Sequence, residues 1–417
     1  MKKFIKKSCY FLSFLFFNTL LTHDLLIVGP TGFCDGTGRI AYALIDQLSD
    51  VLDVAYYRSF RNDAYAEYTL FDDPYKVQKK IKISDSLMDS SVFLYTNSLP
   101  ELLKDESYKK VPATTMRLIY SAFESTAIPA ECVEIFNNYF DKIIVPDPFL
   151  IDAYKNSGVK IPVIAAPMGL YLEKFLQLPL KTNTQKKPFI FSCVGTRYAR
   201  KNIKKLIQAF AAVYGNNKDV VLKLQVKSDT LDLNLQEGLG EYLERFTEEE
   251  LEHFVEKSME EEESLEDLIE ELAVDNIHLL TNVMSEEEYI NFLGASDCYV
   301  LLSKGEGFSN TPREAMAAGI PIIISNNTAH TTIANAGYGI AINCPYEVDA
   351  WYEAFWTSRK AGKQFDCDQK DIETALKEMV NNYDFYLQQT EKAREWVKQY
   401  TWGSLKDSLV KLYSIKK

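Results

Sequence analysis

Two glutamates that flank a glycine-rich turn are the residues of this chain best suited to chemistry. The turn opens the stretch Gly305–Gly319, GEGFSNTPREAMAAG, and seven residues separate Glu306 from Glu314. Short apolar runs typical of buried strands, Cys298–Leu302 and Pro321–Ile324, stand on either side. A helix that begins just after a strand points its macrodipole and unpaired N–H groups out of the strand's carboxyl end. An anion such as a diphosphate binds well there.

The residues after the turn predict how that helix begins. Thr311 is expected to be the N-cap and Pro312 the first helical residue. Glu314 follows three residues after the cap and would complete a capping box. An alternative interpretation is that Glu314 serves only this capping box, and that Glu306 is a solvated loop charge.

A basic turn upstream would supply the cations that an anion site needs. The segment Phe191–Phe210, FSCVGTRYARKNIKKLIQAF, contains a strand-like run that ends at Gly195 and a helical pattern that starts near Asn202. Arg200 and Lys201 are therefore expected at the carboxyl end of a strand, beside a cleft. Fixed cations in such a cleft stabilise a leaving group that gains negative charge. The alternative is a basic turn that interacts only with solvent.

Together these segments resemble the retaining nucleotide-sugar glycosyltransferases of family 4, which have the GT-B fold. Glu306 and Glu314 match the E-x7-E motif of that family, and Arg200–Asn202 matches its basic RKN segment. The resemblance implies that Glu314 binds the ribose hydroxyls of the donor and that Glu306 binds hydroxyls of the transferred sugar. It also implies that Arg200 and Lys201 neutralise the departing diphosphate.

The same resemblance assigns further residues to the donor site. The backbone of the glycine-rich turn would contact the sugar and diphosphate, and the end of the basic strand would lie beside them. The residues so assigned are Gly307, Phe308, Ser309, Asn310, Thr311, Gly195 and Arg197. The family likeness implies front-face attack, in which the leaving phosphate helps to deprotonate the acceptor. Asp366 and Asp368 have Asp-x-Asp spacing, but they flank Cys367 in a polar segment far from the cleft motifs. No Asp-x-Asp pair is therefore expected at a strand end, and no metal or other cofactor is expected.

The first half of the chain contributes a glycine loop and a carboxylate. After the run Leu25–Gly29, the family likeness assigns Gly36 and Gly38 to a loop where the acceptor and the donor phosphates approach the backbone. The glycine spacing is not G-x-G-x-x-G, so a dehydrogenase is a poor match. The sequence FESTAIP at Phe123–Pro129 resembles the FEST segment of some family members. Its Glu124 would orient or deprotonate the acceptor hydroxyl, or make only local hydrogen bonds.

Alternating strand-like and helix-like runs predict two Rossmann-like α/β domains with doubly wound parallel sheets. The first is expected over residues 23–180 and the second over 188–395, with a polar linker, Leu176–Lys187, and a ligand cleft between them. The tail, 396–417, would pack back on the first domain as it does in GT-B enzymes. The expected strands are Leu25–Gly29, Asp53–Tyr57, Val92–Thr96, Leu118–Phe123, Lys142–Val145, Val163–Ala166, Phe189–Val194, Val220–Val226, Ile277–Leu280, Cys298–Leu302, Pro321–Ser325 and Ile340–Asn343.

The charge of the chain is unevenly distributed. Residues 229–275 hold 19 acidic and two basic residues with helical spacing, and are expected to form an acidic insert. The whole chain carries −13, so the rest is mildly basic, near +4. This pattern argues against nucleic acid at the insert and allows anionic ligands elsewhere. Seven scattered cysteines without metal-ligand spacing predict reduced core thiols in a cytosolic protein.

Residues 1–22 place four lysines before a short apolar run. They predict a peripheral membrane contact, or are the product of a misassigned upstream start site. No small-residue cleavage site follows, as a signal peptide would require. Secretion is disfavoured because the sugar nucleotides that the family resemblance implies are cytosolic. The protein is therefore expected in the cytoplasm, in contact with the inner face of the membrane.

The predicted function is a retaining glycosyltransferase of the hexosyltransferase type, EC 2.4. It would move a sugar from a nucleotide diphosphate sugar to a glycan, lipid-linked or other acceptor hydroxyl, as in cell-envelope glycan synthesis. Two alternatives remain. One is a non-catalytic GT-B-like binding or scaffold protein whose acidic insert is the working surface. The other is a sugar-nucleotide epimerase on the same fold.

Overall fold

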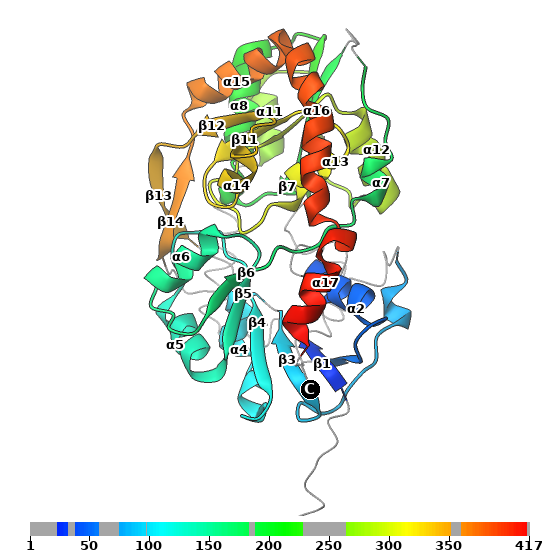
Figure 1. Cartoon of the computed structure of the whole chain (residues 1–417). Coiled ribbons are helices and arrows are strands. Elements are labelled where there is room, and N and C mark those ends of the chain that lie inside the picture. The colour runs from blue at the N-terminus through cyan, green and yellow to red at the C-terminus, as the bar shows by residue number, and fades with distance from the viewer. Residues whose placement is uncertain are drawn as a thin grey trace, which may run out of the picture.

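A computed structural model of the chain describes residues 23–31, 38–57, 75–96, 98–182, 188–227, 264–351 and 360–414. Two α/β domains lie one above the other, each built on a six-stranded sheet (Figure 1). The predicted fold class is confirmed. Gly36, residues 1–22 and most of the acidic insert lie outside the described residues.

The first sheet has the order β2-β1-β3-β4-β5-β6, and all its strand pairs are parallel. Its strands are β1 (His23–Val28), β2 (Val54–Tyr57), β3 (Ser90–Tyr95), β4 (Met116–Tyr120), β5 (Lys142–Val145) and β6 (Val163–Ala165). The helices around it include α2 (Gly38–Leu48), α4 (Leu99–Lys104), α5 (Ala130–Tyr139) and α6 (Phe149–Asn156). The strands are apolar without alternation because both faces of the sheet are covered.

The second sheet has the order β12-β11-β10-β7-β8-β9 and is also parallel throughout. Its strands are β7 (Phe189–Thr196), β8 (Val220–Lys227), β9 (Ile277–Leu280), β10 (Cys298–Leu301), β11 (Ile322–Asn326) and β12 (Ile340–Asn343). Its helices include α8 (Ile203–Tyr214), α11 (Leu265–Leu272), α12 (Glu286–Ala295), α13 (Asn310–Ala317), α14 (His330–Ala334) and α15 (Gln369–Asn381). From β7 the chain adds β8 and β9 on one side, and then returns to add β10, β11 and β12 on the other side. The crevice outside the carboxyl ends of β7 and β10 is therefore a topological switch point.

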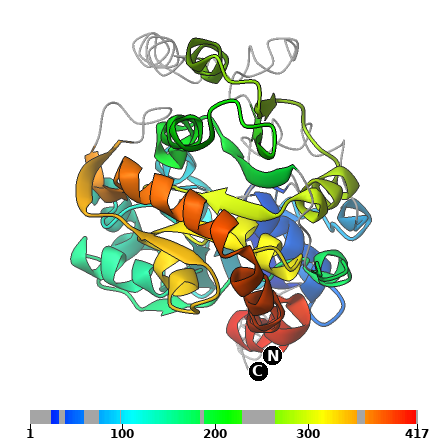
Figure 2. The same ribbon diagram turned by 90° about the horizontal axis from the view of Figure 1, so that it is seen from above.

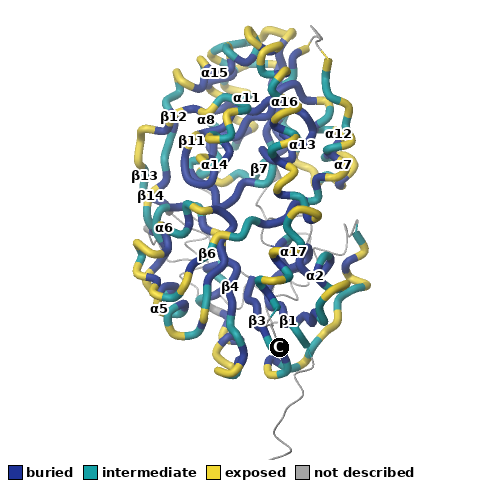
Figure 3. Tube along the Cα trace, viewed as in Figure 1, coloured by how far each residue is buried: buried dark blue, intermediate teal, exposed yellow. Residues whose placement is uncertain are grey.

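Every strand expected from the sequence is present in these two sheets. The buried strands form the interiors of both domains, while exposed residues lie on outer helices and loops (Figure 3). The sequence did not predict the antiparallel hairpin of β13 (Tyr346–Trp351) and β14 (Lys360–Asp366). This hairpin reaches the first domain, where the Thr126 N–H donates to the Lys363 carbonyl at 3.1 Å.

The predicted capping box at α13 is wrong. The helix begins at Asn310, and its N-cap is Ser309, which has a φ of 69° and makes no side-chain cap hydrogen bond. Thr311 therefore lies inside the first turn, and its hydroxyl is hydrogen-bonded to the Tyr299 hydroxyl at 2.6 Å. Glu314 is consequently not a capping residue, and its carboxylate bonds elsewhere.

The C-terminal helices join the two domains. Helix α16 (Tyr383–Val397) packs on α13, a 3-10 turn breaks the helix, and α17 (Trp402–Tyr413) packs against α2 of the first domain (Figure 1). Seen from above, these helices follow one path over the second domain that ends in α17 (Figure 2). The segment just before the linker is bound to the break between α16 and α17, where the C-terminal helices cross from one domain to the other. The Leu170 N–H donates to the Tyr400 carbonyl there, at 2.8 Å.

No helix in the described part of the chain combines the length and apolar character needed to cross a membrane.

The crossing depends on a glycine at 169. A Cβ there would lie 2.5 Å from two ring atoms of Trp402, a side chain that is only 3% exposed. We expect Gly169→Ala to lower the free energy of unfolding by about 1–3 kcal/mol, because the buried ring must move. The measurement is urea unfolding followed by fluorescence and circular dichroism.

The matched control is Gly403→Ala in α17, where an added Cβ meets nothing within 4 Å. There alanine should leave stability unchanged or raise it by up to about 1 kcal/mol through helix propensity. Equal stability of the two variants would contradict the proposed packing of Trp402 on Gly169.

Candidate functional site

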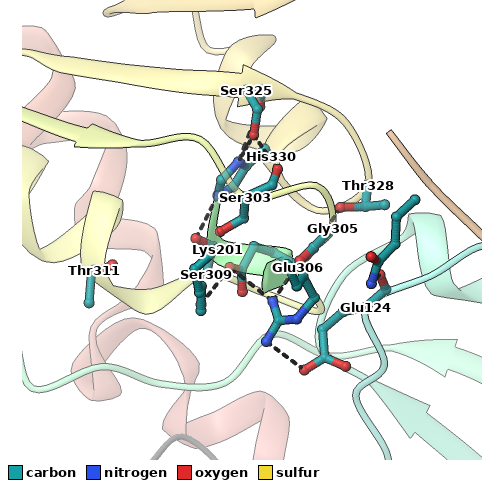
Figure 4. Close-up of polar contacts among 12 residues, drawn as sticks. Glu124, Lys201, Ser303, Gly305, Glu306, Ser309, Thr311, Ser325, Thr328 and His330 are labelled. Carbon is teal, nitrogen blue, oxygen red and sulfur yellow. Dashed lines mark hydrogen bonds and ion pairs between the residues drawn. The ribbon is translucent and has the colours of Figure 1, made fainter. Parts of the chain in front are cut away.

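The candidate site lies where β7 and β10 end. These strands are adjacent and parallel, with Cys298 paired to Phe191, so their carboxyl ends open on the same crevice. The turn after β7 carries Arg200 and Lys201, and the turn after β10 carries Glu306. Figure 4 shows Lys201 and Glu306 close together, with Glu124 of the first domain nearby. The fold thus brings together the two motifs that the sequence singled out.

Glu306 forms the centre of this cluster. Its carboxylate oxygen Oε1 lies 2.6 Å from Lys201 Nζ and 3.1 Å from Arg200 Nη1, and the residue is 6% exposed. Burial alone would raise the pKa of this carboxyl, but the charges of Lys201 and Arg200 outweigh it. They hold the pKa well below its usual value. Glu306 is therefore ionised, and its carboxylate is paired with two cations.

Arg200 connects this cluster to the first domain. Its Nη1 also donates to the Gly305 carbonyl at 2.6 Å, and its Nη2 lies 3.4 Å from Glu124 Oε1. The two glycines of the turn permit this approach. A Cβ on Gly305 would lie 2.1 Å from the Glu124 carbonyl oxygen, and one on Gly307 would lie 3.2 Å from the Phe123 nitrogen. Predicted residues of both domains therefore meet at one guanidinium.

His330, the first residue of α14, lies fully buried behind the turn. Its Nε2 is 2.8 Å from Ser309 Oγ, and its Nδ1 is 3.0 Å from Ser325 Oγ (Figure 4). Burial lowers the pKa of His330 to about 4, so the ring is neutral near pH 7. These contacts make His330 a support that fixes Ser309 at the start of α13.

Glu314 lies on the other side of α13, at the wall of a small pocket, and is 4% exposed. Its Oε1 accepts from Arg39 Nη1 of the first domain at 2.9 Å, and its Oε2 accepts from the Tyr289 hydroxyl at 2.7 Å. Sequence reasoning missed Arg39, although it directly follows Gly38, which begins α2. The pocket is completed by Ala43, Met168, Gly169, Leu170, Tyr171, Phe175 and Glu286.

Arg313 shapes the turn from inside the protein. Its guanidinium carbon lies 4.0 Å from the ring centre of Phe308 and 4.6 Å from that of Tyr400. It donates to the carbonyls of Phe308 and Ser309, the latter at 3.0 Å. The side chain of Phe308 is consequently in the interior, so only its backbone is on the open side of the turn.

Other predicted residues are placed differently. Arg197 is not part of the cluster, since its two terminal nitrogens bond the carboxylate of Glu266 in α11 at 2.8 and 2.6 Å. Gly195 lies at the end of β7, where a Cβ would make only ordinary contacts at 3.8 Å. Asn310 is the first residue of α13.

Asp366 is the last residue of β14, so the Asp366–Asp368 pair does stand at a strand end, contrary to the expectation from the sequence. Sequence reasoning did not assign Asp366 to the site. It accepts from Asn202 Nδ2 at 2.7 Å and from Lys205 Nζ at 2.6 Å. Asp366 thereby fixes the start of α8, immediately after the two cations of the site. In the sequence it stands in a polar segment far from both motifs, and only the hairpin brings it here.

Comparison with known proteins finds a family model that matches part of the chain and solved structures that resemble the whole of it. Residues 177–356 match the family model of glycosyl transferases group 1. The matched region contains the second sheet and the residues of the E-x7-E and RKN segments. No curated protein matches the chain.

Solved structures show the fold of the whole chain. HepE from Anabaena, in complex with UDP-glucose, has a TM-score of 0.62 at 11% identity, covering 94% of this chain and 99% of that one. Sucrose-phosphate synthase from Thermosynechococcus elongatus has a TM-score of 0.61 at 15% identity, with coverages of 94% and 98%. The protein has the GT-B fold.

The buried histidine of this GT-B protein predicts a pH dependence. The folded pKa of His330, about 4, is below the ordinary value of 6.5, so its contribution to stability is complete above pH 6.5. As the pH falls from 6.5 to 4, the unfolded chain binds a proton that the folded chain does not. The free energy of unfolding should fall by up to roughly 1.4 kcal/mol per pH unit.

Urea unfolding at several pH values tests this expectation against His330→Gln, which keeps polar atoms near both serines and does not titrate. The variant should lose less stability than the wild type between pH 6.5 and 4. Parallel curves for the two proteins would show that His330 titrates normally in the fold.

Proposed function

We propose that the protein is a retaining glycosyltransferase that moves a sugar from a nucleotide diphosphate sugar to an acceptor hydroxyl. One observation carries this proposal. Arg200 and Lys201 meet Glu306 at the switch point of a sheet that lies within the region matched by glycosyl transferases group 1. A diphosphate is the anion that a pair of fixed cations beside a helix N-terminus suits.

The donor we propose is a uridine diphosphate sugar. HepE is described in complex with UDP, with UDP and glucose, and with UDP-glucose, and the similarity to it covers 93–94% of this chain. In the proposed complex the diphosphate shares Arg200 and Lys201 with Glu306, and the backbone N–H groups at the start of α13 point toward it. Glu306 then has an oxygen available for hydroxyls of the transferred sugar.

Glu314 is proposed to bind the ribose hydroxyls. Its two oxygens now accept from Arg39 and Tyr289, one partner in each domain. A ribose would replace one of these donors, so nucleotide binding would be an exchange of hydrogen bonds rather than a gain of new ones. The pocket beside Glu314 supports this assignment, since it is lined by apolar and polar side chains of both domains.

Catalysis in this proposal rests on the charge that develops on the leaving group. Arg200 and Lys201 stabilise that charge, because fixed cations favour a leaving group that becomes more negative in the transition state. The departing phosphate removes the proton of the acceptor hydroxyl, and attack from the same face retains the anomeric configuration. Glu124, 3.4 Å from Arg200, is in place to orient the acceptor. The two cations take the part of a metal, so no divalent ion is required.

The acceptor class we propose is a glycan or lipid-linked hydroxyl. We place the reaction in the cytoplasm, with residues 1–22 in peripheral contact with the membrane. The basic body of the chain, near +4 outside the acidic insert, is compatible with an anionic membrane surface.

A thermal-shift screen of the full chain tests the donor site. We expect UDP or a UDP-sugar to raise the melting temperature in the presence of EDTA, because a ligand that binds only the folded state stabilises it. Glu314→Ala and Arg200→Ala should each weaken binding about tenfold or more, since each removes a hydrogen bond to or from a charged group. Titration calorimetry supplies the dissociation constants.

Glu287→Ala is the matched control, because it removes an exposed glutamate from α12 of the same domain. It should bind UDP as the wild type does. Release of UDP from UDP-glucose on addition of acceptor fractions then tests transfer. If UDP, GDP and ADP all fail to shift the melting temperature, the donor site does not exist and the binding or scaffold hypothesis gains support.

A further inference from the structure

Two cysteines meet behind the candidate site. Cys344 follows β12 and Cys367 follows β14, so they stand at the two ends of the β13–β14 hairpin. Their sulfur atoms are 3.1 Å apart, both residues are buried, and both are free thiols. The sequence predicted reduced core thiols and gave no sign that these two residues, 23 positions apart, would touch.

The surroundings of the two sulfurs differ. Cys344 Sγ lies 3.5 Å from the Asn327 amide nitrogen, and the hydrogen bond from Cys367 is the largest influence that lowers the pKa of Cys344. The same contact, together with burial, raises the pKa of Cys367. Cys344 is also the more accessible of the two, at 8% exposure against 0% for Cys367. The pair therefore consists of an outer thiol whose pKa is lowered and an inner thiol whose pKa is raised.

We propose that Cys344 and Cys367 form a redox modification site, at which an external disulfide of low molecular mass converts the two thiols into an intramolecular disulfide. The inference is independent of the glycosyltransferase proposal. It rests on the contact between the sulfurs and on their unequal exposure. Few atoms need to move, since the sulfurs must close from 3.1 Å to about 2.05 Å.

The reaction proceeds by two thiol–disulfide exchanges. The Cys344 thiolate attacks one sulfur of the external disulfide, which forms a mixed disulfide and releases one thiolate. Cys367 then loses its proton and attacks the Cys344 sulfur, which releases the second thiolate. The two protein sulfurs are oxidised by two electrons in total, and the external disulfide is reduced to two thiols. A dithiol reductant reverses both steps.

The position of the pair gives this modification a structural effect. Asn327 donates to the Ser303 and Phe365 carbonyls, at 2.9 and 3.2 Å, as well as contacting Cys344. The neighbour of Cys367 is Asp366, which holds Asn202 beside the cations of the site. A disulfide would tie these supports together covalently and restrict the unfolded chain, so it should raise resistance to unfolding.

Oxidised glutathione and the full chain provide the test. After oxidation, the free thiols are alkylated in denaturant and the peptides are mapped by mass spectrometry. We expect a Cys344–Cys367 linked peptide, with the other described cysteines alkylated. The melting temperature should rise by several degrees and return after treatment with dithiothreitol.

Three variants define the order of events. Cys367→Ser should stop at a glutathione adduct on Cys344, because the second exchange has no thiol. Cys344→Ser should give neither the adduct nor the rise in melting temperature. Cys193→Ser, which removes another buried thiol from β7, should form the linked peptide as the wild type does.

Two results would overturn the inference. One is a wild-type protein that carries glutathione on Cys344 without the internal link, or that resists oxidation entirely. The other is a linked peptide that appears only when urea is present during oxidation, since that outcome would require unfolding rather than the native contact.

Discussion

The ion cluster of Glu306 with Lys201 and Arg200 is the constraint on which the rest of the site depends. A carboxylate that is 6% exposed is costly unless it is paired and hydrogen-bonded. Its partners come from the end of β7, while Glu306 itself follows β10. The two strand ends must therefore be neighbours in register, which the parallel pairing of β7 with β10 provides. The ion cluster can therefore form only in a sheet in which β7 and β10 are neighbours.

The same cluster explains why small residues stand where the domains meet. Arg200 reaches Glu124 of the first domain only because Gly305 and Gly307 leave the backbone of the turn open to it. A second interdomain contact, Arg39 with Glu314, closes the other side of α13. The groups suited to a donor are thereby satisfied by protein partners from both domains. Ligand binding must compete with these contacts, so a bound ligand would also alter the contacts that hold the two domains together.

The sequence was sufficient for the sheets and for the central motifs. Strands such as β5 are short apolar runs buried on both faces, and this pattern can be recognised without knowing which strands lie beside them. Glu306 and Arg200 could be paired because each follows a strand end, and parallel strand ends share an edge. Whatever depends on distant contacts was lost. Arg39 and Glu314 are 275 positions apart, and no local pattern indicates that they meet.

Local reasoning also failed where tertiary structure overrode a preference. A capping box at Thr311 was reasonable from sequence, but Ser309 enters the helix with a left-handed φ, and the Thr311 hydroxyl is engaged by Tyr299. The hairpin β13–β14 was missed, and with it Asp366 and the approach of its terminal cysteines. The family likeness assigned Arg197 to the donor site, yet its guanidinium binds the carboxylate of Glu266.

Arg313 shows how the turn and the domain junction become a single unit. A fully buried guanidinium needs acceptors and aromatic faces, and it finds the Phe308 and Ser309 carbonyls and two rings. One of those rings belongs to Tyr400, at the break where the C-terminal helices pass from the second domain to the first. The Tyr400 carbonyl in turn accepts from the Leu170 N–H, in the segment just before the linker. A displacement of the turn around Phe308 would therefore strain the crossing, and a displacement of the crossing would be transmitted to the turn.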